Sequence, residues 1–329
     1  MARAARHDRA PVIQGPARPA DFLQLARPHQ WSKSVFVLVG PFYGLRELAA
    51  AGASAASVVL AAVIAASAFA LASSGCYVIN DIFDREADRA HPRKKSRPIA
   101  AGRVPLGTAW FYALALFVVG FALVLFLPPE GRGWVALSMA LYVANVSAYS
   151  AYFKHKVIAD VMSLSLGFVL RVMGGCAAVG IEPSVWLLNV TFFLSMFLAF
   201  GKRLGERRTL AAVEAEVRHA APALAVAHRR VQAGYTDALL QMAVVVTAVI
   251  TLMTYALYVT DHGTRYVVGF NLLWLTMLPA TYGLLRIIVK LEHGVFDDPT
   301  EIALHDRGVQ AAGLLFAALT VALMWLLKP

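Results

Sequence analysis

Long apolar stretches recur along this chain, and short segments that carry most of the charged residues separate them. Several stretches exceed about 18 residues, the length at which a helix spans a bilayer, and alternation typical of strands does not recur. The pattern therefore predicts an all-α polytopic membrane helical bundle with about nine transmembrane helices. The expected spans are 34–45, 54–79, 108–127, 133–152, 157–180, 184–201, 236–260, 267–290 and 308–327.

The composition agrees with a lipid environment. Of the 329 residues, 59% are apolar and 15% are charged, whereas about a quarter of a soluble domain is charged. Residues 1–20 carry Arg, Pro and His without an apolar core, which predicts a disordered cytoplasmic tail. Residues 21–329 are expected to form a single integral-membrane domain. Cys76 and Cys176 lie in expected spans without metal-ligand spacing, so we interpret them as small packing residues.

The net charge of +10 is distributed unevenly along the chain. If the N-terminus is cytoplasmic, 23 of the 30 Lys and Arg residues fall on that side and 4 on the other. This asymmetry follows the positive-inside rule. It predicts a multi-pass protein of the inner (plasma) membrane whose polar segments 83–107, 202–235 and 291–307 face the cytoplasm. The excess of Lys and Arg is thus explained by topology. The expected partner is the bilayer and not nucleic acid.

The most informative polar residues follow the second expected span. Asn80, Asp84 and Asp88 are spaced i, i+4, i+8, and on a helix they form one stripe flanked by Tyr77 and Asp81. Acidic groups at the end of a span repel one another and are costly near lipid. Mg²⁺ would neutralise them, because it binds one or two carboxylates together with substrate phosphate oxygens. The alternative is an acidic helix end paired with nearby Arg and Lys.

A basic loop follows at once. Five of the nine residues from Arg89 to Arg97 are Arg or Lys, including Arg93 and Lys95, and His91 lies among them. Beside a metal site, such a loop suits a substrate that bears several phosphates, since Arg binds their oxygens in a bidentate manner. The alternative is an ordinary cytoplasmic loop that contacts anionic headgroups.

Other charged residues lie beside or inside expected spans. Asp160 and Arg171 fall within apolar stretches, where an ionisable side chain usually marks a functional site. Lys154 or Lys156 is the expected partner of Asp160, and Arg171 would bind an anion or form a structural ion pair. The remaining candidates, which would contact phosphate or only set the topology, are Lys33, Lys202 and Arg203.

The segment Asn80–Gly102 resembles the UbiA superfamily of intramembrane prenyltransferases. The superfamily's N-D-x-x-D-x-x-x-D motif corresponds to Asn80–Asp88, and its basic loop ending R-P-x-x-x-G corresponds to Arg97–Gly102. The resemblance extends over residues 22–327 and implies a nine-span fold. Many members carry two aspartates four residues apart after the fourth span. This chain has Asp160 alone, which puts a second metal held there by paired carboxylates in doubt.

Three further segments resemble the superfamily members that transfer a phosphoribosyl group: Arg27–Lys33, Gly201–Arg203 and Glu301–Arg307. The resemblance implies Mg²⁺ as cofactor, 5-phospho-α-D-ribose 1-diphosphate as donor and a polyprenyl (decaprenyl) phosphate as acceptor. It also implies a cytoplasmic active site, diphosphate as the leaving group and a product that serves as a cell-wall precursor for arabinan biosynthesis. A homo-oligomer is compatible with the sequence.

On this resemblance the candidate residues divide by role. Metal ligands are Asn80, Asp84 and Asp88. The residues assigned to catalysis are Asp81, Asp84 and Arg171. The donor would be bound by Lys33, Tyr77, Lys95 and Arg97. Lys154 and Arg171 would lie between the donor and acceptor phosphates. The other substrate-binding candidates are Asp160, Lys202 and Arg203.

Two other functions remain open. A prenyltransferase could use the same acidic stripe to bind a polyprenyl diphosphate as electrophile, with an aromatic or other acceptor. A transporter of an anionic metabolite would be expected to carry Gly- or Pro-broken spans in matching positions of two repeats. No such pair is visible in the sequence, and the acidic stripe suits metal binding better.

Overall fold

A computed structural model describes residues 17–90, 94–217, 234–261, 269–293 and 299–326. Within these ranges all regular elements are helices, and seven of them are long and apolar enough to cross a membrane. They are α3 (Ala55–Phe83), α5 (Leu106–Val124), α6 (Pro129–Ala151), α7 (Ala159–Ala178), α8 (Val185–Val217), α10 (Asp237–Asp261), and η6 (Leu272–Thr276) continued by α11 (Met277–Glu292).

The predicted all-α membrane bundle is confirmed, whereas the count of nine spans is not. The first and last expected spans correspond to α2 (Val35–Ala50) and α13 (Arg307–Leu326). The helix α2 has only 16 residues and contains Pro41, and the apolar part of α13 is shorter than a full span. Seven spans and two shorter helices therefore account for the nine apolar stretches.

Short helices that the apolar pattern does not predict lie next to the polar residues. The first is α1 (Pro19–Ala26), which the 3-10 helix η1 (Pro28–Ser34) follows. The second group is α4 (Arg85–Ala90) and η2 (Lys94–Ser96), which lie in the expected cytoplasmic segment 83–107. The helix α8 also continues well beyond residue 201, where its expected span ends.

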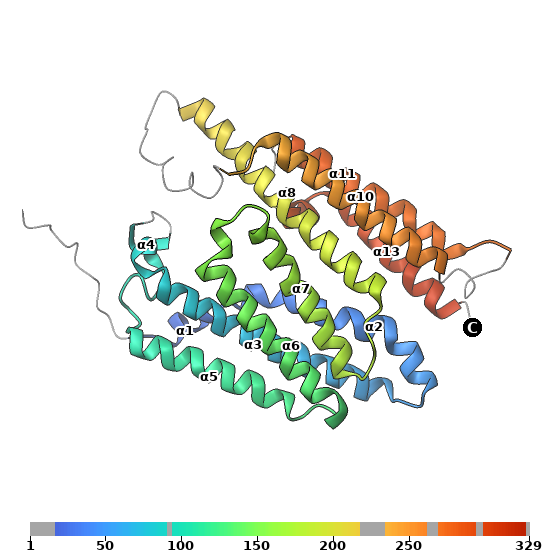
Figure 1. Ribbon diagram of the computed structural model, residues 1–329, viewed down its shortest axis with the longest axis horizontal. Helices are drawn as coiled ribbons and strands as arrows, with labels where there is room; N and C mark the ends of the chain where they lie inside the picture. The colour runs from blue at the N-terminus through green and yellow to red at the C-terminus, as the bar shows by residue number, and fades with distance from the viewer. Residues whose placement is uncertain (1–16, 91–93, 218–233, 262–268, 294–298, 327–329) are drawn as a thin grey trace, which may run out of the picture. The chain divides into compact units, whose positions relative to one another are not determined.

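The chain divides into two compact units. The first comprises residues 1–150 and 170–182, and the second comprises residues 151–169 and 183–329. In the first unit α3 lies beside α5 (Figure 1). Small residues of α3 such as Ala65 and Ala68 are fully buried and permit close helix packing.

The second half of α7 belongs to the first unit. A Cβ atom at Gly175 would collide with the carbonyl oxygen of Val37, so glycine is required where α7 crosses α2. Cys176 is buried next to this contact, and Cys76 is buried in α3; neither forms a disulfide. Both cysteines therefore fill space in the packed bundle, as the sequence indicated.

In the second unit α8 and α10 lie side by side, and α11 packs against α13 (Figure 1). Fully buried side chains from five helices contribute to its core, including Val161, Phe197, Leu240, Leu291 and Ile302. The helix α12 (Pro299–His305) contributes Ile302.

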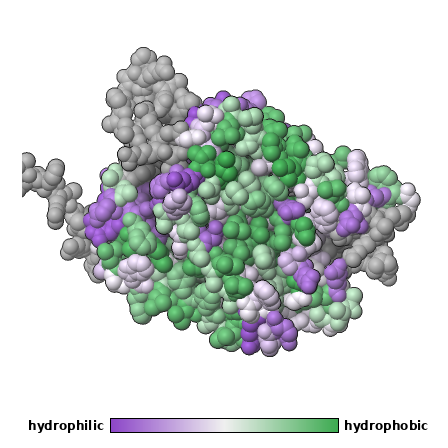
Figure 2. Space-filling view, viewed as in Figure 1, coloured by the Kyte–Doolittle hydropathy of each residue, from purple (hydrophilic) through white to green (hydrophobic). Residues whose placement is uncertain are grey.

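The outer surface of many helices is apolar. Trp110, Phe111 and Leu114 of α5 are exposed, as are Met242 and Val245 of α10. Hydrophobic residues cover much of the visible surface, and hydrophilic residues gather near α4 (Figure 2). Exposed apolar surface of this extent needs lipid as its solvent, so this is an integral membrane protein.

Candidate functional site

The acidic stripe lies where α3 ends. Asp84 leaves the helix with φ −83° and ψ 3°, and α4 begins at Arg85. Hydrogen bonds of the helical type continue through this break, from the Asp84 N–H to the Asn80 carbonyl (2.9 Å) and from the Asp88 N–H to the Asp84 carbonyl (2.8 Å). Because the helical spacing survives, the side chains still meet: Asn80 Nδ2 donates to Asp84 Oδ2 at 3.0 Å.

Two arginines neutralise the other two aspartates. Arg97 Nη1 lies 2.7 Å from Asp88 Oδ2 and 3.0 Å from Asp81 Oδ1, and Arg27 Nη2 lies 2.6 Å from the same Asp81 oxygen. Both aspartates are buried, at 3% and 4% exposure. The structure thus pairs Asp81 and Asp88 with arginine, the alternative weighed for an acidic helix end. Asp84 accepts a hydrogen bond from Asn80.

Sequence reasoning missed Arg27 as a site residue. Its backbone lies in the left-handed region with φ 51°, between α1 and η1, and both of these elements pack against α3. Its guanidinium lies 4.8 Å from the centre of the Tyr77 ring. Two local signals point to it: Arg27 begins the segment Arg27–Lys33 that resembles the superfamily, and the following Pro28 disfavours helical backbone at Arg27. The ion pair with Asp81 joins residues 54 positions apart, which no periodicity reveals.

The segment η1 is fixed to α3 by polar contacts. Trp31 Nε1 donates to Ser74 Oγ at 3.0 Å, and Ser74 donates to the Ala26 carbonyl at 2.6 Å. The Tyr77 hydroxyl donates more weakly to Gln30, at 3.4 Å. These contacts place Tyr77 beside Arg27 and the acidic stripe. Lys33, at the end of η1, is exposed.

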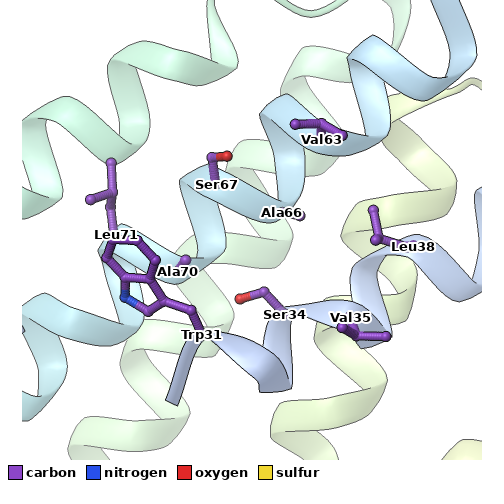
Figure 3. A pocket seen from close by; sticks show the side chains of 9 residues that line it. All are labelled: Trp31, Ser34, Val35, Leu38, Val63, Ala66, Ser67, Ala70 and Leu71. Atoms are coloured by element: carbon purple, nitrogen blue, oxygen red, sulfur yellow. The ribbon is translucent and has the colours of Figure 1, made fainter. Parts of the chain in front are cut away.

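A groove of about 370 Å³ opens beside η1 in the same unit (Figure 3). Its lining comes from η1, α2 and α3 and is mostly hydrocarbon. The residues drawn are Trp31, Ser34, Val35, Leu38, Val63, Ala66, Ser67, Ala70 and Leu71. This lining does not suit a phosphate, so the polar chemistry belongs to the acidic stripe and not to the groove.

The residues around Asp84 can accommodate a hard cation. Among the described residues no three His, Cys, Asp or Glu side chains gather as a metal site. Asn80 and Asp84, however, bring an amide group and a carboxylate together, and rotation of the Asn80 amide would turn its oxygen toward a cation. Mg²⁺ binds to as few as one or two carboxylates when substrate oxygens complete its shell. Asp88 would have to leave Arg97 to join them.

The basic loop is anchored at its base. Arg103 Nε donates to Asp21 Oδ1 of α1 at 2.7 Å, and Arg89 Nε donates to the Ala100 carbonyl at 3.0 Å. The hydrogen bond from Arg103 holds the pKa of Asp21 below its ordinary value. Lys95 is exposed and is therefore available to a ligand. His91 and Arg93 of this loop lie outside the described residues.

Arg171 is buried within the first unit, at 4% exposure. Its Nη2 donates to the Tyr142 hydroxyl at 2.7 Å, and its guanidinium lies 4.3 Å from the centre of the Tyr142 ring. The Tyr142 hydroxyl in turn donates to Ser73 of α3. A cation–π contact offsets part of the cost of burying this charge.

Asp160, Lys154, Lys202 and Arg203 belong to the second unit. Asp160 is fully buried, and its cationic partner is Arg203 at 3.4 Å, where the sequence analysis expected Lys154 or Lys156. Lys156 lies instead over the ring of Tyr152, 5.2 Å from its centre. The helix α8 continues past residue 201, and this extension presents Arg203 to Asp160; Lys202 is exposed.

Tyr235 also contacts Asp160, and the sequence analysis missed it. Its hydroxyl donates to Asp160 Oδ1 at 2.5 Å and accepts from the Ile158 N–H at 2.7 Å. Ile158 has φ 70°, a conformation that costs a β-branched residue about 1–3 kcal/mol. Tyr235 lies 75 positions from Asp160, so no local pattern points to it.

The Glu301–Arg307 segment has a structural role. Asp306 caps α13, since its Oδ1 accepts from the N–H groups of Gly308 (2.9 Å) and Val309 (3.0 Å). The Arg286 guanidinium of α11 binds both carboxylate oxygens, at 2.5 and 3.1 Å. A Cβ atom at Gly308 would collide with this guanidinium. These contacts join α11 to α13, and Asp306 is therefore a structural residue.

Comparisons with known proteins agree with the fold. Residues 36–290 match the UbiA prenyltransferase family. The chain is 33% identical over 318 residues to a decaprenyl-phosphate phosphoribosyltransferase of Corynebacterium glutamicum, covering 95% of this chain and 90% of that protein. It is 32% identical over 314 residues to one of Mycobacterium tuberculosis, covering 93% and 95% respectively.

Solved structures show the same fold. A UbiA homolog from Archaeoglobus fulgidus bound to DMAPP and Mg²⁺ matches with a TM-score of 0.63 and 17% identity, over 92% of this chain and 98% of that chain. At this identity the likeness concerns the fold alone. The family match, however, covers most of the chain, and the relatives match almost throughout. The chain therefore belongs to the UbiA prenyltransferase family, a family of membrane transferases.

Proposed function

We propose that this protein transfers the 5-phosphoribosyl group from 5-phospho-α-D-ribose 1-diphosphate to a polyprenyl (decaprenyl) phosphate, with Mg²⁺, at the cytoplasmic face of the inner membrane. The observation that carries the proposal is the cluster at the end of α3, where Arg27 and Arg97 converge on Asp81 beside Asn80 and Asp84. The names of the relatives support a phosphoribosyl group as the group transferred and decaprenyl phosphate as the acceptor.

The first unit supplies the groups that suit the donor. The diphosphate and the 5-phosphate of the donor require more positive charge than one divalent cation provides. Arg97 can exchange its carboxylate partners for phosphate oxygens, because its side chain is 25% exposed. Lys33 and Lys95 are exposed and can bind the 5-phosphate, and Tyr77 can position the donor beside Arg27.

Asn80 and Asp84 would hold the metal, with Asp88 as a third ligand once Arg97 moves to substrate. Bound there, Mg²⁺ would neutralise the negative charge that develops on the leaving diphosphate. Asp81 would remain with Arg27 and keep that guanidinium in place. The roles assigned to Asp84 and Asp81 thus differ, one holding the cation and the other holding an arginine.

Lys154 and Arg171 are proposed for the phosphates of donor and acceptor, and Lys202 and Arg203 for the acceptor phosphate. Asp160 would hold the Arg203 guanidinium. In the reaction the bond between ribose C1 and the diphosphate oxygen breaks, and a bond from C1 to an oxygen of the polyprenyl phosphate forms with inversion. The ribosyl centre passes through an oxocarbenium-like state, as in other glycosyl transfers. The acceptor phosphate is already anionic near neutral pH, so no general base is needed.

The test supplies purified full-length protein with Mg²⁺, ribose-labelled phosphoribosyl diphosphate and polyprenyl phosphate. We expect label to enter the lipid phase, with release of one diphosphate for each lipid labelled. Omission of Mg²⁺ is the control. If label never enters the lipid, while a polyprenyl diphosphate is consumed with an aromatic acceptor, the protein is a prenyltransferase and the proposal is wrong.

A further inference from the structure

A chain of polar contacts in the second unit ends on one hydroxyl. The Tyr235 hydroxyl donates to Asp160 Oδ1 at 2.5 Å, and Asp160 Oδ2 lies 3.4 Å from the Arg203 guanidinium. Tyr235 and Asp160 are buried, at 2% and 0% exposure, whereas the Arg203 side chain is 19% exposed. The buried Tyr235 hydroxyl therefore orients the Asp160 carboxylate, and the Arg203 guanidinium paired with that carboxylate remains accessible to a ligand.

Tyr235 is itself held firmly. Arg207 Nη1 donates to its carbonyl oxygen at 2.7 Å, and Arg207 Nε donates to Asp237 at 2.6 Å. The Phe200 ring packs edge-on against its ring, with centres 6.3 Å apart. Arg203 and Arg207 are four residues apart on α8 and share one helix face. The backbone and ring of Tyr235 thus fix where its hydroxyl can lie.

Asp160 has hydrogen-bonding capacity left over. Its Oδ2 is buried and accepts no hydrogen bond from the described residues. A buried carboxylate is costly unless it is paired, so its orientation toward Arg203 matters for the charge of both groups. Arg203 also reaches Glu206, at 3.3 Å. Small changes at Asp160 would therefore redirect the guanidinium of Arg203.

We propose that Tyr235 is a positioning residue that acts through Asp160 to aim Arg203 at the phosphate group of the polyprenyl phosphate. The inference rests on the proposed function, which makes that lipid the acceptor. The hydroxyl remains a donor at neutral pH, because burial raises the pKa of Tyr235 above its ordinary value and the hydrogen bond to Asp160 raises it further.

Equilibrium binding tests the inference without any transfer step. A polyprenyl monophosphate is titrated into full-length protein in lipid nanodiscs that lack the ribosyl donor. For Tyr235→Phe we expect about tenfold weaker lipid binding, as for the loss of one hydrogen bond to a charged group. Binding of phosphoribosyl diphosphate with Mg²⁺ should stay within about twofold of wild type, because its proposed contacts lie elsewhere.

Two further variants separate positioning from general stability. Asp160→Asn should weaken lipid binding similarly, and adding Tyr235→Phe to it should change little, because both act on one chain of contacts. Tyr255→Phe is the matched control. It also removes a tyrosine hydroxyl from the second unit, bonded to Thr276 at 2.6 Å, but near the other end of α10. It should leave lipid binding unchanged.

A purely structural role for the hydroxyl predicts a different result. In that case the main task of the hydroxyl would be to accept the hydrogen bond from the Ile158 N–H and so hold the strained backbone at φ 70°. Glycine adopts this φ without strain, so adding Ile158→Gly to Tyr235→Phe should restore lipid binding. We expect no restoration. Three results would overturn the inference and leave the proposed function intact. They are restored lipid binding on adding Ile158→Gly, a loss of lipid binding in Tyr255→Phe equal to that in Tyr235→Phe, and unchanged lipid binding in Tyr235→Phe. If wild-type protein does not bind the lipid phosphate, the proposed function itself fails, and the inference fails with it.

Discussion

The guanidinium of Arg97 lies 2.7 Å from the carboxylate of Asp88, nine positions earlier in the chain. The same nitrogen reaches Asp81 at 3.0 Å. Asp88 is proposed as a metal ligand and Arg97 as a phosphate ligand, so each must change partner when the metal and the donor bind. The ion pair keeps both charges balanced until then, which avoids an unpaired buried carboxylate.

This arrangement distinguishes Arg97 from Lys95. We expect Lys95→Ala to raise the apparent KM for phosphoribosyl diphosphate by roughly tenfold without changing the free energy of unfolding, because Lys95 is exposed. Arg97→Ala should raise the same KM and also destabilise the fold by about 2 kcal/mol, since two buried carboxylates lose a charged donor. Steady-state kinetics and thermal unfolding in detergent measure both effects. Equal unfolding temperatures for the two variants would show that the Arg97 ion pairs contribute nothing to the fold.

Much of the fold could be predicted from the sequence. A long apolar run is visible in neighbouring residues, and within the described residues each of the nine expected stretches is helical over most of its length. The short helix α4 could not be read this way, because Asp84 interrupts α3 by a backbone turn and not by a change of composition. The number of full spans also escaped prediction, since α2 and the apolar part of α13 are shorter than a bilayer requires.

The candidate site was predictable only in part. Asn80 and Asp84 meet because they are one helical turn apart, a spacing visible in the sequence. The contacts of Arg27 with Asp81, and of Tyr235 with Asp160, join residues 54 and 75 positions apart. Such pairs form only once separate segments pack together. Periodicity within one element carries no information about them.

Asp84 is expected to be the residue most sensitive to a conservative change. Asp84→Asn keeps the size of the side chain and removes its charge, so we expect turnover to fall at least about 10²-fold, a barrier increase of roughly 2.7 kcal/mol. The fold should persist, because Asp84 is only half-buried. Glu86→Gln, an exposed carboxylate two residues away, is the control. Near-normal turnover of Asp84→Asn at limiting Mg²⁺ would exclude Asp84 as a ligand.

The topology can be tested by single cysteines at exposed positions. Ser96→Cys, Thr236→Cys and His293→Cys should react with a membrane-impermeant thiol reagent only from the cytoplasmic side, as the distribution of Lys and Arg predicts. Glu130→Cys should react only from outside. Cys76 and Cys176 are buried, so the background should be low. Labelling of any of the first three from outside would overturn the predicted orientation.

Asp306 should affect stability and not substrate binding. Asp306→Ala removes the cap of α13 and both hydrogen bonds to Arg286, and we expect the unfolding temperature to fall by roughly 3–6 °C. The KM values for both substrates should remain within about twofold of wild type. Glu301→Ala, an exposed residue of the same segment, serves as the control. A large rise in either KM, without a change in unfolding temperature, would assign this segment to the active site instead.

Asp21 should make part of the stability dependent on pH. The hydrogen bond from Arg103 holds the pKa of this carboxylate below its ordinary value of 3.8 in the folded state, whereas the unfolded chain has no such partner. The unfolded state therefore takes up the proton first as the pH falls. The contribution of Asp21 is fully present above pH 3.8 and is lost as the pH decreases through the lower pKa of the folded state. Asp21→Asn should lower the unfolding temperature at pH 7 and should matter progressively less below pH 4. Thermal unfolding of wild type and Asp21→Asn between about pH 3 and pH 7 measures this difference. A difference that stays constant over the whole range would mean that the ion pair with Arg103 does not hold α1 against the basic loop.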